Sequence, residues 1–276
     1  MAAIGIPAAL AIVYLGGWVL ATVVAALGIA GAGEMYRLAR LRDVRPLNLS
    51  GQAGAALIPL AAFATFPDGL GLDHAWLVLG AAVWILAVLL VAVARRAPDD
   101  RVLSAVAVTI FGALYAAGLP AFLIWLRHAD GTVGPWPATW LVFLPLAVTW
   151  LCDTAAMLGG AVFGGRKLAP VLSPGKTWAG AVAGLLGAVL TALAYAHWVL
   201  DRVGYHVPVA ALVLVGVAIG TLGQLGDLAE SLLKREAGLK DSGTMFAGHG
   251  GVLDRLDSLY FGIPLTALVL HLFGTI

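Results

Sequence analysis

The chain has 276 residues, of which 61% are apolar and only 11% are charged. Its mean hydropathy is +0.97. This composition excludes an ordinary water-soluble globular protein, and the recurring apolar runs of about 20 residues predict an all-α, polytopic integral membrane protein. The formal charge of +1 says nothing useful about partners. The single cysteine, Cys152, excludes a disulfide framework within one chain.

Hydropathy predicts eight or nine transmembrane helices. The count depends on Gly16–Gly17, which could separate two short helices or be a flexible point in one long helix. The first apolar run lacks a basic start and is followed by similar runs, so we do not expect a cleaved signal peptide. We expect one membrane-embedded domain, 1–276, with N-terminal helices in 1–135 and a motif-bearing half in 136–276. The predicted spans are Ile4–Tyr14, Trp18–Ala32, Gly51–Phe66, Ala75–Ala94, Val102–Leu126, Thr139–Val162, Thr177–Leu200, Val207–Leu233 and Val252–Phe273.

Basic residues alternate between the predicted loops. Four loops are rich in arginine and lysine, whereas the intervening loops hold only Arg127 and Arg202 beside several aspartates. The positive-inside rule assigns the four rich loops to the cytoplasm, which predicts a multi-pass protein of the cell (inner) membrane with its polar site facing the cytoplasm. These loops contain Arg37, Arg40, Arg42 and Arg45; Arg95, Arg96 and Arg101; Arg166, Lys167 and Lys176; and Lys234, Arg235 and Lys240.

The first polar cluster includes Asp153 on a predicted membrane helix and the short motif Ser173-Pro-Gly-Lys-Thr177 in the loop that follows. Gly-Lys-Thr suggests a P-loop, but Pro170 stands where that motif needs glycine, and the flanking segments are membrane helices instead of a strand and a helix. We therefore reject the P-loop. Arg166 is better explained as a topology determinant. The candidates for binding phosphate are Lys167 and Lys176, with Ser173 and Thr177 as hydroxyl donors.

The second cluster is a polar stripe on the helix that starts near Val207. Asp227, Glu230, Ser231 and Lys234 have the spacing i, i+3, i+4, i+7, so they share one face of an otherwise apolar helix. An i,i+4 pair between Glu230 and Lys234 would explain Glu230. It leaves Asp227 without a partner on its own helix, near the cytoplasmic edge of the bilayer. A metal or phosphate role for Asp227 is therefore favoured.

The third cluster runs from Gly248-His-Gly-Gly251 into a predicted helix start that contains Asp254 and Asp257. Glycines let backbone N–H groups approach a ligand, and the helix start favours an anion. The two carboxylates are three residues apart and can face one way, as Mg²⁺ binding requires. The alternative is a plain glycine loop in which Asp254 and Arg255 form a solvated pair and Asp257 interacts with the helix dipole from the first turn. His249 alone is weak support for catalysis.

The last two clusters share the segment Ser231–Ser258, which holds eight charged side chains in a chain that is 11% charged. The segment reads Ser231-Leu-Leu-Lys-Arg, then Lys240-Asp-Ser-Gly, then Gly248-His-Gly-Gly-Val-Leu-Asp-Arg-Leu-Asp-Ser258. It closely resembles the signature of phosphatidate cytidylyltransferases, also called CDP-diacylglycerol synthases. The loop Ser173–Trp178, the triplet at Asp153 and Gly226-Asp-Leu are also similar to that family. The resemblance covers about 145–258 with specific motifs and the rest through hydropathy alone.

The resemblance implies transfer of CMP from CTP to phosphatidate with Mg²⁺, giving CDP-diacylglycerol and pyrophosphate. The partners would be CTP, phosphatidate and membrane lipid, with no nucleic acid; a homodimer and a second, monovalent cation are left open. Asp227, Asp254 and Asp257 would bind the metal, and Lys240 and His249 would join them in catalysis. The implied substrate-binding residues are Asp153, Lys167, Ser173, Lys176, Thr177, Ser231, Lys234, Arg235, Gly250, Gly251 and Arg255.

Two positions depart from the family pattern. Ala247 stands where proline is usual, and Ala179 stands where glutamate usually follows the tryptophan. The first should change loop rigidity only, whereas the second removes a carboxylate beside the predicted site.

Three alternatives remain. A polyprenol or phytol kinase-like enzyme, or another lipid-phosphate nucleotidyltransferase, would share the membrane fold and some of the acids. A CDP-alcohol phosphotransferase is disfavoured because its Asp-Gly-x-x-Ala-Arg signature is absent. A secondary transporter is a remote alternative, since no internal repeat is evident and most of the acids cluster at one end of the helices.

Overall fold

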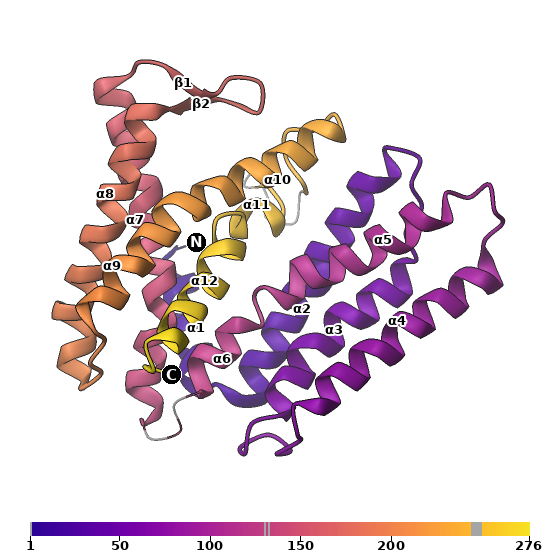
Figure 1. Cartoon of the computed structure of the whole chain (residues 1–276), viewed down its shortest axis with the longest axis horizontal. Coiled ribbons are helices and arrows are strands. Elements are labelled where there is room, and N and C mark those ends of the chain that lie inside the picture. The colour runs from indigo at the N-terminus through magenta and orange to yellow at the C-terminus, as the bar shows by residue number, and fades with distance from the viewer. Residues whose placement is uncertain (1, 130, 132, 244–249) are drawn as a thin grey trace. The chain divides into compact units, whose positions relative to one another are not determined.

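Helices form nearly all of the regular structure in the computed structural model, which describes residues 2–129, 131, 133–243 and 250–276 (Figure 1). This confirms the all-α class. Within the described residues one small sheet occurs, an antiparallel hairpin of β1 (Lys167–Ala169) and β2 (Ser173–Thr177). The short loop predicted at Ser173–Thr177 is a β-strand instead, because the backbone before Pro170 pairs with the backbone after it.

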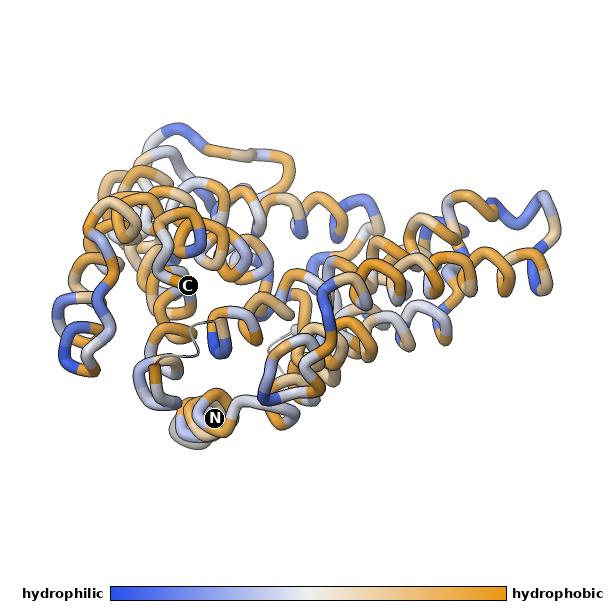
Figure 2. The backbone as a smooth tube through the Cα atoms, turned by 60° about the horizontal axis from the view of Figure 1, so that its bottom comes forward, coloured by the Kyte–Doolittle hydropathy of each residue, from blue (hydrophilic) through white to orange (hydrophobic). Residues whose placement is uncertain are grey.

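Each of the nine predicted spans contains a helix. Among the described residues, six helical stretches are long and apolar enough to cross a membrane. In Figure 2 the hydrophobic colour follows the long helices, and the hydrophilic colour gathers at the turns between them. The six stretches are Gly17–Arg40, Ala75–Arg95, Val102–His128, Pro135–Phe163, Trp178–Val203 and Val209–Glu236, and Gly5–Leu15 and Leu259–Leu272 are shorter apolar helices.

The ambiguity at the N-terminus resolves into two helices. α1 (Ala2–Leu15) ends before Gly16, and α2 (Gly17–Arg40) begins directly after it. Gly16, which lies between the two helices, has a positive φ of 57°, and Gly17 at the start of α2 has one of 52°. Glycine adopts this left-handed conformation at little cost, and it interrupts the regular α-helix. The same break separates two compact units. The first unit comprises Met1–Leu15, Trp125–Leu232 and Asp257–Ile276, and the second comprises Gly16–Ile124 and Leu233–Leu256.

In the first unit, α7 (Pro135–Phe163) packs closely against α8 (Trp178–Tyr195). A Cβ atom added at Gly159 would overlap Ala183, and one added at Gly187 would lie 2.5 Å from the Cβ of Ala155. Small residues let membrane helices approach in this way. A continuous helical run, α9 (Val209–Ala218), a π-helical turn (Ile219–Gly223) and α10 (Gln224–Glu236), lies beside them. The Gln224 amide donates 3.1 Å to the carbonyl of Ala181 and so ties the start of α10 to α8.

The first unit also contains α6 from Trp125 onward (the whole helix is Phe122–His128) and α12 (Leu259–Leu272). The Arg127 side chain donates to the carbonyls of Val13 and Tyr14 at 2.8 and 2.9 Å and so caps the end of α1.

In the second unit, α2 packs against α3 (Asn48–Ala64) and α5 (Val102–Ala113), and α4 (Ala75–Arg95) covers α3 and α5. Tyr36 is fully buried, and its hydroxyl donates 2.7 Å to the carbonyl of Thr109. A Cβ at Gly51 or Gly112 would overlap the Tyr36 ring region, so these glycines make room for it. The last turns of α2 are thereby fixed against α3 and α5.

Three of the four arginine-rich loops meet within the second unit. Arg96 donates 2.7 Å to the carbonyl of Arg45, and Arg101 donates 3.2 Å to that of Arg42. Arg42 in turn donates to the carbonyl of Glu236. These contacts agree with the prediction that the loops share one side of the membrane.

The final predicted span begins too early. α11 (Leu253–Leu256) is a separate helix of four residues, and α12 starts only at Leu259. Two backbone N–H groups in this region donate to side chains instead of to helical carbonyls. The N–H of Gly251 donates to Asp254, and the N–H of Ser258 donates to Asp257. Such local bonds compete with helix propagation.

Candidate active site

The hairpin and the first turn of α10 bring Lys176 and Asp227 together. The Lys176 Nζ lies 2.5 Å from the Asp227 Oδ2, and each side chain is 26% exposed. The Ser231 hydroxyl, one turn further along α10, lies 3.4 Å from the other oxygen of Asp227. The shared helix face predicted for Asp227 and Ser231 is confirmed. The basic partner of Asp227 comes from β2, 51 residues earlier.

Asp153 joins this pair from α7. It lies close enough to Asp227 and Lys176 to interact with both electrostatically. Asp153, Lys176, Asp227 and Ser231 therefore form the cluster around Asp227, in which Lys176 pairs with Asp227 and Asp153 adds a second carboxylate. Asp153 and Asp227 lie on membrane helices, and ionisable side chains in such helices are typical of a functional site.

The other predicted residues of the hairpin have different positions. Thr177 is buried, and its hydroxyl accepts 3.1 Å from the N–H of Gly180, so it caps the start of α8. Lys167 is exposed on β1 opposite Thr177, and Ser173 is half-buried on β2. The structure thus brings Lys176 to the acids and leaves Lys167 on the surface.

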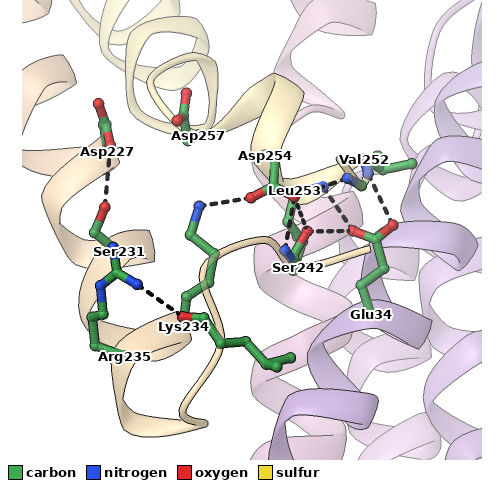
Figure 3. Close-up of polar contacts among 12 residues, drawn as sticks. Glu34, Asp227, Ser231, Lys234, Arg235, Ser242, Val252, Leu253, Asp254 and Asp257 are labelled. Carbon is green, nitrogen blue, oxygen red and sulfur yellow. Dashed lines mark hydrogen bonds and ion pairs between the residues drawn. The ribbon is translucent and has the colours of Figure 1, made fainter. Parts of the chain in front are cut away.

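A separate polar cluster lies in the second unit around Asp254 (Figure 3). The Lys234 Nζ lies 2.6 Å from the Asp254 Oδ1, and the two side chains are only 11% and 8% exposed. The other oxygen, Oδ2, accepts from the N–H of Ser242, the hydroxyl of Ser242 and the N–H of Gly251, each at 2.8 Å. Asp254 is therefore no solvated partner of Arg255.

The glycine at 250 suits this carboxylate. Gly250 has a φ of +81°, and a Cβ there would lie 2.8 Å from the Asp254 Oδ2. Burial alone would raise the pKa of Asp254, but the hydrogen bonds from Lys234, Gly251 and Ser242 outweigh it and lower the pKa to about 2. Asp254 is thus an ionised carboxylate at neutral pH.

Glu34 of α2 belongs to the same cluster, and sequence reasoning missed it. Its carboxylate accepts 2.9 Å from the N–H of Val252 and 3.0 Å from that of Leu253, and the Ser242 hydroxyl lies 2.9 Å from it. A signal was available, since Glu34 is the only acidic residue before Asp43 and sits on a long apolar helix. The predicted span ended at Ala32, so Glu34 was counted as part of a loop.

The remaining predicted residues divide between the units. Arg235 donates 3.3 Å to the carbonyl of Leu239, and Lys240 and Arg255 are exposed in the second unit. Asp257 is half-buried in the first unit. His249 and Ala247 lie outside the described residues.

The predicted metal ligands are likewise divided, with Asp227 and Asp257 in the first unit and Asp254 in the second. In the part of the chain that the structure describes, no group of three His, Cys, Asp or Glu side chains could hold a metal ion. The metal role of these residues stays a prediction.

Comparison with known proteins gives a consistent result over the whole chain. A model described as "Cytidylyltransferase family" matches residues 1–273. A phosphatidate cytidylyltransferase of Synechocystis is 30% identical over 285 residues, covering 96% of this chain and 92% of the relative. The chloroplastic phosphatidate cytidylyltransferase 5 of Arabidopsis thaliana is 32% identical over 291 residues, covering 95% of this chain and 68% of the relative.

Higher identity occurs over a shorter stretch. A phosphatidate cytidylyltransferase of Brucella suis is 46% identical over 163 residues, covering 59% of this chain, and the chain spans only 56% of that relative's length. The family match also includes the N-terminal helices, where the sequence motifs gave no resemblance beyond hydropathy.

Proposed function

The chain belongs to the cytidylyltransferase family, and on this premise we propose that it transfers CMP from CTP to phosphatidate, forming CDP-diacylglycerol and pyrophosphate. The observation that carries the proposal is the Synechocystis relative, a phosphatidate cytidylyltransferase that aligns with 96% of this chain. The two polar clusters support it, because both place a lysine against an aspartate in or beside the signature segment.

The reaction joins a lipid phosphate to the α-phosphate of a soluble nucleotide. An oxygen of the phosphatidate phosphate attacks the α-phosphorus in line, the bond from this phosphorus to the bridging oxygen breaks, and pyrophosphate leaves with that electron pair. Little covalent chemistry falls to the protein, so its residues position the phosphates and neutralise their charge. Lys176, Lys234, Lys240 and Arg255 supply positive charge for this task.

Lys176 and Lys234 each contact an aspartate. A phosphate that enters can therefore compete with Asp227 for Lys176, and with Asp254 for Lys234. Such exchange keeps each ammonium group compensated before and after substrate binds. Asp153 adds a second carboxylate whose charge interacts with both Lys176 and Asp227.

The chemistry of the two aspartates fits a Mg²⁺ ion. Asp227 Oδ2 and Asp254 Oδ1 each face an ammonium group, so each oxygen already lies against a positive charge. Carboxylate oxygens are also the ligands that Mg²⁺ prefers, together with substrate phosphates. We propose that Mg²⁺ binding uses carboxylate oxygens of the predicted set, Asp227 and Asp257 in the first unit and Asp254 in the second, and the ion would neutralise phosphate charge. A monovalent cation beside it stays open.

The direct test is pyrophosphate release from CTP by the purified full chain in detergent micelles. Release should require both phosphatidate and Mg²⁺, and omission of either is the control. A lipid kinase would instead release a nucleoside diphosphate, and a transporter would show no turnover without two compartments. Either result would overturn the proposed function.

We also propose that the site faces the cytoplasm, as the positive-inside rule predicts. Asp68 and Asp99 test this orientation because both are exposed and α4 lies between them in the chain. In a variant with Cys152 replaced by serine, Asp99→Cys should react with an impermeant thiol reagent only from the cytoplasmic side, and Asp68→Cys only from outside. The opposite pattern would reverse the orientation. Ser242 is unsuitable as a probe because it is fully buried.

A further inference from the structure

We propose that Glu34 is a positioning residue for the reaction, which anchors the signature segment from the N-terminal helix α2. The inference rests on the proposed function for its kinetic consequence, and on the contacts within the second unit for its physical basis. Glu34 touches Ser242, Val252 and Leu253, and we call these four residues the Glu34 clamp.

The carboxylate of Glu34 satisfies two successive backbone donors. Oε1 accepts from Val252 N–H at 2.9 Å, and Oε2 accepts from Leu253 N–H at 3.0 Å (Figure 3). These amides open the short helix α11, where backbone N–H groups have no helical partner. Bonds from N–H groups to a carboxylate are shorter and stronger than those to a neutral acceptor, so a charged acid holds this turn better than an amide would.

Two glycines of the signature segment are explained by the same carboxylate. A Cβ atom built on Gly243 would overlap the Glu34 carboxylate, and so would one built on Gly251. Glycine at these two positions, eight residues apart, lets the backbone close on one side chain of a distant helix. The two glycines therefore leave the space that the Glu34 carboxylate occupies.

A second residue of α2 also contacts the signature segment. Arg37, one turn after Glu34, donates to the carbonyl of Ser242, whose hydroxyl lies 2.9 Å from Glu34 Oε2. Tyr36, between these two residues, is fully buried and bonded to Thr109. The end of α2 is thus a fixed support that presents an acid and a base to Ser242.

The clamp acts on the chemistry through Asp254. Ser242 donates its backbone N–H to Asp254 Oδ2, and so does Gly251, which directly precedes Val252. Glu34 thus fixes the donors that hold one oxygen of Asp254 while the other oxygen faces Lys234. No contact between Glu34 and Asp254 is needed for this effect, and a small displacement of a reacting group can lower a rate strongly.

The test compares Glu34→Gln with a matched control, Glu236→Gln, in the full chain. Glu236 is exposed in the same unit, so the same chemical change there leaves the clamp intact. In Glu34→Gln an NH₂ group replaces one acceptor and faces a backbone donor. We expect kcat for pyrophosphate release to fall at least about tenfold, with a smaller change in KM for CTP and an almost unchanged unfolding midpoint. Glu34→Asp, which keeps the charge, should retain intermediate activity.

Hydrogen exchange of the amides supplies a readout that needs no substrate. Exchange in a peptide that covers 250–256 should be faster in Glu34→Gln than in the wild-type protein or in Glu236→Gln. If Glu34→Gln keeps the kcat and the amide exchange rate of the wild-type protein, the proposal is overturned. It is also overturned if kcat falls only in proportion to the fraction of protein that is no longer folded. If the wild-type protein releases no pyrophosphate, the proposed function fails, and the exchange data alone decide whether Glu34 holds these amides.

Discussion

Two lysine–aspartate pairs in this chain have almost the same geometry and very different surroundings. The nitrogen–oxygen distance is 2.5 Å for Lys176–Asp227 in the first unit and 2.6 Å for Lys234–Asp254 in the second. The first pair is 26% exposed on both sides, whereas the side chains of the second are 11% and 8% exposed. Among the described residues, Asp227 accepts one further bond, from Ser231 at 3.4 Å, whereas Asp254 accepts three at 2.8 Å.

This difference in burial and hydrogen bonding indicates how much each aspartate contributes to stability apart from any role in the reaction. A partly exposed pair contributes about 0–1 kcal/mol to stability. Removing one partner of a buried pair costs about 3–5 kcal/mol, because a charge is left without compensation. Asp227 is therefore available for chemistry at little structural cost, whereas Asp254 has to serve the fold of its segment as well.

The largest expected effect is on turnover in Asp227→Asn. We expect kcat for pyrophosphate release to fall by at least about 10²–10³-fold, since the variant loses a charge that organises Lys176 and the proposed metal. The unfolding midpoint should stay close to that of the wild-type protein. Activity near the wild-type value would remove Asp227 from the site, and a large loss of stability would contradict its description as a structurally minor pair.

Asp254→Asn should differ by unfolding more easily as well as losing turnover. The amide cannot compensate the buried Lys234 ammonium group, so the free energy of unfolding should drop by about 3–5 kcal/mol. Unfolding in mixed detergent micelles measures the change, with Asp227→Asn as the control. A drop no larger than that of Asp227→Asn would mean that the two pairs do not differ.

Replacing exposed basic residues should change the kinetics and leave the stability unchanged. Lys240→Ala and Arg255→Ala each remove a charge from the surface of the second unit. A charge-assisted hydrogen bond to phosphate contributes about 1.5–3 kcal/mol, so kcat/KM for CTP should fall roughly tenfold or more. Unchanged kinetics in both variants would move the nucleotide site toward Lys167 and Lys176.

The smallest expected effect is the change in the stability difference between wild type and Asp254→Asn with pH. The folded state lowers the pKa of Asp254 to about 2, so the stabilisation from its charge is complete above the ordinary pKa of about 4 and is lost only as the pH falls toward 2. The stability difference between wild type and Asp254→Asn should therefore be the same at pH 7 and pH 5. A smaller difference at pH 5 would show that the carboxylate is not held in this way.

The sequence predicted the helices well because lipid forces backbone groups to pair within each segment, so apolar length alone locates a span. It missed the hairpin, since strands of three and five residues give no period to read. It also placed the start of the last helix too early, because the side-chain bonds of Asp254 and Asp257 decide where the helix is interrupted.

Only the part of the site that depends on local sequence spacing was predicted. Residues close in sequence, such as Asp227 and Ser231, were found from helical spacing. The partners of Glu34 are more than 200 residues away along the chain, and no local pattern connects them. Lys176 was expected to bind phosphate, but its contact with Asp227 depends on how β2 and α10 pack.

The most direct measurement of the difference between the pairs is the coupling free energy of each in unfolding. Two double-mutant cycles, Lys176→Met with Asp227→Asn and Lys234→Met with Asp254→Asn, can be measured in the same mixed micelles. We predict a coupling of at most about 1 kcal/mol for the first pair and at least about 2 kcal/mol for the second. Equal couplings, or a larger one for Lys176 and Asp227, would contradict the division of tasks between the two aspartates.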